Sequence, residues 1–344
     1  MVGLALGVAG FALLLWRGPW LIDGGHLRPT NLQPADAVVI TGVRTALVAL
    51  GAGAVAAAGL YYTHRTLEHT RAKDREQAEL TREGQITDRY IEAIKLLSSE
   101  HATQRLGGVY ALERIMTDSV KDRATIIEVL ASFIREIGNL SEAEDGDPAK
   151  EEVFAALTVL GRRLQNGDPF VKLPRVNLHG VDLFKAHLDH YVDFREARLS
   201  QSRMELVRLD GARLQKANLE GVEMEKTSLS AVALTGAQLR KARLTLVNIE
   251  NSTLHGVDLT DAHLLAVDLS GSNLKQANLS GAVLDSVNLR GADLTDALGC
   301  TVEALLKCTL DSKTRLPSEL SADDRVQAHI ESCELARAQG SRHE

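Results

Sequence analysis

Apolar residues follow three different patterns along this chain of 344 residues. Near the N-terminus they form two nearly unbroken runs, and after a polar stretch they recur at spacings of three and four. From about residue 176 the spacing becomes five and is kept for more than a hundred residues. The first patterns predict helices, whereas a spacing of five predicts a chain that turns once in every repeat.

The two N-terminal runs predict transmembrane helices at residues 1–22 and 44–62, joined by a short external loop at 23–43. A helix needs roughly 20 mostly apolar residues to cross the hydrocarbon core of a bilayer. The first run reaches that length only if Arg17 lies at the interface. A cleaved signal peptide is the alternative for this run, but no Lys or Arg precedes Arg17. A buried helix rich in Ala and Gly is the alternative for the second run.

Basic residues indicate the orientation of the two helices. The predicted loop contains one of them, Arg28, whereas four follow the second run closely: Arg65, Arg71, Lys73 and Arg75. Lys and Arg near the ends of membrane helices favour the cytoplasmic side. The sequence therefore predicts a two-pass protein of the plasma (inner) membrane with both termini in the cytoplasm. The lipid bilayer is its first expected partner.

The middle of the chain is predicted to be helical. Residues 63–87 are polar and contain no proline, which predicts a stalk helix. A single exposed helix is favoured over a coiled coil because the apolar positions do not sustain a heptad. Residues 88–169 carry apolar positions spaced three and four apart, which predicts a small helical domain.

The repeat consists of twenty-four bulky apolar centres, at residues 178, 183 and 188 and then at every fifth residue from 194 to 294. Ala, Val, Ser or Thr stands two residues before every centre. On an α-helix a step of five would spread the centres around the surface, and on one strand alternate centres would point to opposite faces. The chain must therefore turn in each repeat, with both positions pointing into a stacked coil.

Three repeats read Ala-Asn-Leu or Ala-Asp-Leu, at residues 217–219, 277–279 and 292–294. They resemble the consensus A(D/N)LXX of the pentapeptide-repeat family. The resemblance implies that four repeats make one square turn of a right-handed β-helix, so that twenty-four repeats give six coils.

The region before the repeats is similar to the helical region of membrane-attached bacterial members of that family. Three stretches carry this similarity: 87–90, 106–114 and 155–163. The expected fold is an all-β repeat solenoid, a right-handed quadrilateral β-helix at 170–298, preceded by an α-helical domain and two transmembrane helices.

Two irregularities interrupt or end the repeat. The step from Leu188 to Phe194 is six residues, which predicts a bulge or small loop. The regular centres end at residue 294, so residues 299–317 are expected to cap the open end, partly as a short helix. Residues 318–344 are predicted to be a flexible tail that is helical only in part.

The charge of the repeat region bears on its partners. The whole chain has a net charge of −7, and residues 170–298 hold sixteen acidic and fifteen basic residues. Family members that protect DNA gyrase present an acidic column that mimics DNA, and this near-neutral column argues against that function. Residues 196–298 also lack aromatic side chains on which bases stack, so no nucleic acid is expected as a partner.

A possible partner-binding surface lies in the first half of the repeat. Four arginines precede the centre in four successive repeats, one for each side of a square coil: Arg198, Arg203, Arg208 and Arg213. They are a candidate surface for an anion or a protein. The alternative is solvated charge, partly paired with Glu196, Glu205 and Asp210.

Other residues with reactive or metal-binding side chains are few. Cys300, Cys308 and Cys333 cannot form a disulfide framework and are expected to be plain thiols. The histidines of the repeat have no cysteine near them, and a zinc site needs three or four converging ligands. The sequence therefore predicts no catalytic residue, no cofactor and no metal.

These observations predict a non-enzymatic scaffold anchored in the membrane. It would present a rigid column to an unidentified protein partner on the cytoplasmic side. One alternative is an uncharacterised enzyme or regulator that uses the helical domain. Another is a DNA mimic that protects gyrase, which the charge disfavours. The sequence does not indicate an oligomeric state.

Overall fold

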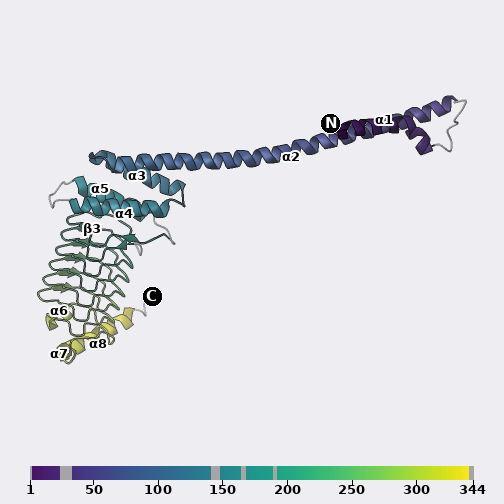
Figure 1. Cartoon of the computed structure of the whole chain (residues 1–344). Coiled ribbons are helices and arrows are strands. Elements are labelled where there is room, and N and C mark those ends of the chain that lie inside the picture. Colours follow the sequence, from purple (N-terminus) through teal and green to yellow (C-terminus); the bar gives the residue numbers. More distant parts are fainter. Residues whose placement is uncertain (1, 24–32, 141–147, 164–167, 189–191, 341–344) are drawn as a thin grey trace. The chain divides into compact units, whose positions relative to one another are not determined.

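A computed structural model describes residues 2–23, 33–140, 148–163, 168–188 and 192–340. These residues belong to two compact units, Met1–Gly84 and Gln85–Glu344, and the boundary falls inside the long helix α2 (Pro34–Leu97). The first unit is helical. The second contains helices and a column of short parallel strands (Figure 1).

The first unit is a pair of antiparallel helices, α1 (Val2–Asp23) and the N-terminal part of α2. A glycine lets them approach closely, since a methyl group added to Gly51 would lie 2.5 Å from the Phe11 ring. Arg44 Nε donates a hydrogen bond of 3.2 Å to the Leu15 carbonyl oxygen. The two apolar runs therefore pack against each other as helices.

Helix α2 begins at Pro34 and not at residue 44, so residues 34–43 of the predicted external loop are helical. Proline fits the first turn of a helix because its missing N–H would have no partner there. The Asp36 carboxylate accepts a hydrogen bond of 3.0 Å from the Gln33 N–H and so supports this start. Residues 24–32 of the predicted loop lie outside the described residues.

From Pro34, α2 continues for 64 residues through the predicted stalk, where the described side chains up to Gln85 are exposed. Among the described helices, α2 is the one long and apolar enough to cross a membrane. The apolar part of α1, Gly7–Ile22, is shorter than such a span. The structure thus offers one candidate span where the sequence predicted two, and membrane crossing stays a prediction.

Three helices follow α2 and pack with its end into a small bundle: α3 (Ala102–Asp118), α4 (Arg123–Leu140) and α5 (Pro148–Arg163). The predicted apolar faces are buried, and Leu112 and Leu160 are 0% exposed. Arg105 donates two hydrogen bonds of 2.8 Å to the carboxylate of the fully buried Glu152. This ion pair joins α3 to α5, and the Arg105 guanidinium neutralises the charge of the buried carboxylate.

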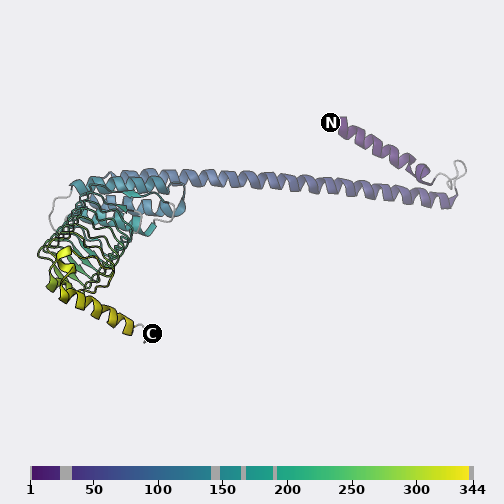
Figure 2. The same ribbon diagram turned by 90° about the horizontal axis from the view of Figure 1, so that it is seen from below.

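Helices α4 and α5 cover the N-terminal end of the column (Figures 1 and 2). Glycines make this close approach possible. A methyl group added to Gly138 would lie 2.5 Å from the Asn177 carbonyl oxygen, and one added to Gly161 would overlap the His187 carbonyl oxygen. Because one apolar core runs from the bundle into the coils, the bundle serves as a cap for the solenoid.

The column consists of four-sided coils of twenty residues. Backbone bridges between successive coils form four series with partners twenty residues apart, for example Asn218–Gln238, Glu223–Arg243, Ser228–Asn248 and Ala233–Thr253. Every centre from Leu178 to Leu294 is at most 4% exposed. The solenoid, its four sides and its inward-pointing centres are therefore confirmed.

One side of the column is more extended than the others and forms a five-stranded parallel sheet. Its strands are β3 (Arg203–Glu205), β4 (Glu223–Glu225), β5 (Arg243–Thr245), β6 (His263–Leu265) and β7 (Val283–Asp285). Two shorter strands pair at the start of the column: β1 (Val171–Lys172) and β2 (Val192–Asp193).

The predicted six-residue step appears as a change of register. Val171 in β1 lies opposite Val192, twenty-one residues later, whereas Asp193 is bridged to Arg213, twenty residues later. The extra residue therefore precedes Val192. Residues 189–191, where the bulge was expected, lie outside the described residues.

The predicted cap at 299–317 extends the last coil. It begins with the short helix α6 (Val302–Leu305), where Thr301 Oγ1 accepts a hydrogen bond of 3.2 Å from the Ala304 N–H. Beyond α6, backbone bridges continue on two sides of the coil: Asn288–Thr309 and Asp293–Arg315.

The prediction of a flexible tail at 318–344 is wrong for its described part. Two helices form there: α7 (Ser318–Ser321) and α8 (Asp324–Gly340). Val326 is 0% and Ile330 8% exposed, so α8 adds to the apolar core at this end of the column. In the sequence, the signal for this helix is limited to two apolar residues four apart, Val326 and Ile330. The surface that buries them forms only when the cap has folded.

Candidate functional site: the strand face

The side of the column with β3 to β7 and the matching part of the first coil is here called the strand face. It comprises six rows: residues 182–185, 203–206, 223–226, 243–246, 263–266 and 283–286. Side chains alternate in direction along a strand, so each centre points inward and the residues before and after it point outward. Two lines of exposed side chains therefore run along the column.

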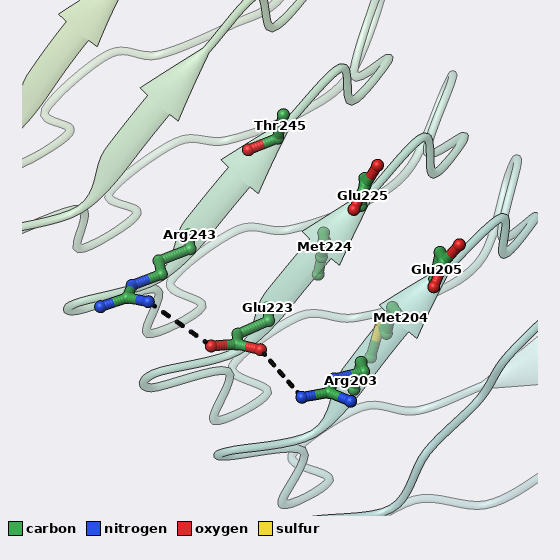
Figure 3. A pocket seen from close by; sticks show the side chains of 8 residues that line it. All are labelled: Arg203, Met204, Glu205, Glu223, Met224, Glu225, Arg243 and Thr245. Carbon is green, nitrogen blue, oxygen red and sulfur yellow. Dashed lines mark ion pairs between the residues drawn. The ribbon is translucent and has the colours of Figure 1, made fainter.

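A groove of about 380 Å³ lies between these two lines over β3 to β5. One wall is formed by Arg203, Glu223 and Arg243, the residues before the centres. Figure 3 shows the opposite wall, which is formed by the residues after the centres: Glu205, Glu225 and Thr245. One wall thus alternates in charge, and the other is mainly acidic.

Ion pairs connect successive strands along the first wall (Figure 3). The Glu223 carboxylate lies 3.6 Å from the Arg203 guanidinium and 3.7 Å from that of Arg243. All three side chains are about half exposed or more, and ion pairs of this kind contribute about 0–1 kcal/mol each. These ion pairs therefore add little to the stability of the fold. Their main effect is to give the surface a pattern of alternating charge.

Lys226 adds a positive charge beside the acidic wall. Its ammonium group lies 2.8 Å from a carboxylate oxygen of Glu225. This hydrogen bond, together with the charge of Glu225, raises the pKa of Lys226. The ammonium group therefore stays charged at neutral pH.

The strand face also exposes large apolar side chains. Within residues 176–297, all those that the structure describes as exposed lie on this face: Phe184 (40%), Leu206 (37%), Leu246 (52%), Leu265 (47%) and Val283 (45%). The other three sides carry mostly polar and charged residues at these positions. Apolar side chains gathered on one face of an otherwise polar surface indicate an interaction site.

Two of these leucines occupy strained corners of the coil. Leu206 and Leu246 have φ angles of 58° and 53°, in the left-handed region. This conformation costs a residue other than glycine roughly 1–2 kcal/mol. Glycine stands at such a corner in eight repeats of the other sides and in none of the strand face. An exposed leucine there adds little to the core, so its contribution is to the surface.

The four arginines predicted as a binding surface are distributed one to each side of a coil. Arg203 lies on the strand face. Arg208 is 3.8 Å from Asp210, the Arg213 guanidinium lies 4.6 Å from the centre of the Phe170 ring, and Arg198 is exposed. The structure does not gather them on one surface, and their joint role in binding stays a prediction.

Other groups with reactive side chains lie in the C-terminal cap and in α8. Burial raises the pKa of Cys300 to about 11 and that of Cys308 to about 12, which makes both thiols poor nucleophiles. His329 Nε2 lies 2.8 Å from the Cys308 carbonyl oxygen and 3.6 Å from Cys333 Sγ. Within the described ranges, no group of three or more His, Cys, Asp or Glu side chains is placed to hold a metal ion.

Comparison with known proteins identifies the column. Residues 191–225, 227–264 and 262–298 match the family model for pentapeptide repeats, with eight copies. This segment consists of pentapeptide repeats. The helices before the column and the first coil lie outside the match. No curated protein matches the sequence.

Several solved structures are similar to this chain, among them two of pentapeptide repeat proteins. One, from the Arabidopsis thaliana thylakoid lumen, is 25% identical; the match covers 28% of this chain and 63% of that chain, with a TM-score of 0.21. Rfr23 from the cyanobacterium Cyanothece 51142 is 21% identical over 39% and 90% of the two chains, with a TM-score of 0.20. QnrB1, a plasmid-mediated fluoroquinolone resistance protein, is 16% identical over 47% and 86%, with a TM-score of 0.22.

All five strands β3 to β7 of the strand face depart from the repeat consensus, whereas the other sides depart from it only in some coils. Elsewhere an Asn or Asp before the centre often accepts a hydrogen bond from the N–H two residues later, as Asn278 does from Ser280 at 3.1 Å. In β3 to β7 this position holds Arg, Glu, Arg, His and Val, so none of these five strands has the short Asn or Asp acceptor. Sequence reasoning missed this signal because it recurs every twenty residues and not every five.

Proposed function

We propose that the protein is a membrane-anchored scaffold that binds another protein through the strand face. The observation that carries the proposal is the gathering of exposed apolar side chains, from Phe184 to Val283, beside a charged groove. Apolar contacts supply affinity at protein interfaces, and the charges around them supply specificity. The buried centres hold this surface rigid, so little ordering entropy opposes binding.

The anchor in this proposal is the N-terminal part of α2, which is long and apolar enough to cross a membrane. The apolar run at 1–22 forms the second pass. The basic residues between Arg65 and Arg75 favour the cytoplasmic side of the inner membrane for everything that follows.

The two alternative functions have less support. An enzyme in the helical bundle has no observation that favours it, and the fully buried carboxylate there, Glu152, is bound on both oxygens by Arg105. A DNA mimic would need a strongly acidic surface, whereas the strand face combines apolar, basic and acidic residues.

Carbonate extraction tests the anchor. The full chain is expected to stay in the membrane pellet, and a chain that begins at residue 85 is expected to be released, because it lacks the apolar part of α2. Release of the full chain by carbonate would disprove anchoring and leave the question of protein binding open.

A photo-cross-linking amino acid at one position of the column tests the strand face. Placed at Leu265, it is expected to cross-link to protein in intact cells. The matched control is Thr235, which also follows a centre but lies on another side of the column. Equal cross-linking at both positions, or none at Leu265, would contradict the proposal.

A further inference from the structure

We infer that the protein bound by the strand face is a second copy of this chain. The two copies form a dimer whose twofold axis runs parallel to the strands and passes between β4 and β5. The inference rests on the proposed function in one respect, namely that the strand face binds protein. It adds the identity of the partner and the register of the contact.

The alternating wall makes the strand face complementary to itself. Along the line before the centres the charges are negative, positive, negative and positive: Asp182, Arg203, Glu223 and Arg243. A twofold axis parallel to the strands places this line opposite the same line of the other copy, in reverse order. With the axis between β4 and β5, Glu223 of each copy lies opposite Arg243 of the other. Two reciprocal ion pairs then flank the axis.

The rest of the face is compatible with the same register. In the remaining pairs no carboxylate opposes a carboxylate, and no Lys or Arg opposes another Lys or Arg. These pairs are Glu225–Thr245, Lys226–Leu246, Arg203–His263, Glu205–Leu265, Leu206–Ala266, Asp182–Val283, Phe184–Asp285 and Lys185–Ser286. All six rows of the face take part. The exposed leucines lie opposite another apolar residue, the long stem of Lys226 or the side chain of Glu205.

Other twofold arrangements are less favourable. An axis parallel to the column would place Glu223 opposite Glu225 of the other copy. An axis between β3 and β4 would place Glu205 opposite Glu225 and would overlap four rows instead of six. Like charges that face each other across an interface are destabilising, so the axis between β4 and β5 is the register that the face favours.

The size of the face sets the expected strength of the dimer. Six rows spaced by about 4.8 Å and four residues of about 3.3 Å each give a flat area of roughly 400 Å². A standard interface buries about 800 Å² on each partner, so the contact is expected to be weak in dilute solution. Confinement of both copies to one membrane would raise their effective concentration and favour the contact.

Charge exchange between two copies tests the inference. Full-length chains with two different tags are expressed together, and co-purification of one tag with the other is measured. Glu223→Arg alone and Arg243→Glu alone each place like charges opposite each other on both sides of the axis. Each is expected to reduce co-purification about tenfold. A mixture of Glu223→Arg with Arg243→Glu chains restores both opposite-charge pairs and is expected to restore co-purification.

Recovery in the mixture cannot come from the ion pairs within one chain, because each chain in it still carries only its own substitution. Arg240→Glu, on another side of the column, is the matched control and should leave co-purification unchanged. Far-UV circular dichroism checks that all variants stay folded. Single variants that co-purify like the wild type, or a mixture that does not recover, would overturn the dimer.

The cross-linker at Leu265 separates this inference from the proposed function. A cross-link to a second copy of the chain supports both. A cross-link exclusively to a different protein overturns the dimer and leaves the scaffold proposal standing.

Discussion

At the scale of single residues, neighbours in the column have opposite environments. Leu239 is 2% exposed and points into the column, while the next residue, Arg240, is exposed. We predict that Leu239→Asp unfolds the column locally, because a buried carboxylate without a partner costs several kcal/mol. Arg240→Asp is expected to leave the fold intact. Far-UV circular dichroism and thermal unfolding compare the two, and equal damage would contradict the inward and outward assignments.

At Leu246 the backbone conformation is unfavourable for leucine, and the side chain is exposed and not part of the core. Its φ of 53° suits Asn or Gly better than Leu, and its side chain is 52% exposed. We predict that Leu246→Asn raises the free energy of unfolding by about 1 kcal/mol or less and weakens binding by the strand face. Lys241→Asn, at the same kind of corner on another side, should have a similar effect on stability and none on binding. Denaturant unfolding together with cross-linking at Leu265 measures both effects.

At the scale of elements, local patterns were predicted well and long-range packing was not. The coils followed from the sequence because each centre, such as Leu219 or Leu279, repeats one local arrangement. The helix α8 did not, because Val326 and Ile330 are buried by residues that are distant in sequence. The strand face was missed for a similar reason. It becomes visible only when residues twenty apart, such as Arg203 and Glu223, are compared.

The contact between α5 and the first coil gives a prediction at this scale. In an exposed helix, Gly→Ala stabilises by roughly 0.5–1 kcal/mol because the backbone loses less entropy on folding. We predict this gain for Gly107→Ala in α3, where an added methyl group meets nothing within 4 Å. Gly161→Ala is expected to destabilise instead, since its methyl group would overlap the His187 carbonyl oxygen. Thermal unfolding of the two variants should show shifts of opposite sign, and equal shifts would contradict the close packing.

At the scale of the whole molecule, the column is covered at both ends. Helices α4 and α5 cover the first coil, and α6 and α8 add their apolar residues at the last. An open end would expose apolar centres and unpaired backbone groups, which favour association with other chains. The bundle is therefore expected to be necessary for a soluble column.

Truncation tests this expectation. We predict that a chain starting at residue 168, without α3 to α5, forms large aggregates. A chain starting at residue 85 keeps these helices and should elute from a sizing column as a discrete species. Discrete elution of the shorter chain would show that the bundle is dispensable for closing the column.

The interval of twenty residues between bridged partners also governs how the molecule tolerates changes in its length. Removal of residues 227–246 would take out one complete coil, shorten the column by about 4.8 Å and leave every later side chain on its own side. Removal of residues 227–231 alone would keep the centres packed but rotate everything after them by a quarter turn. Leu265 and Val283 would then leave the side that holds Phe184 and Leu206. Insertions and deletions that keep the later residues on their own sides of the column should therefore occur as whole coils.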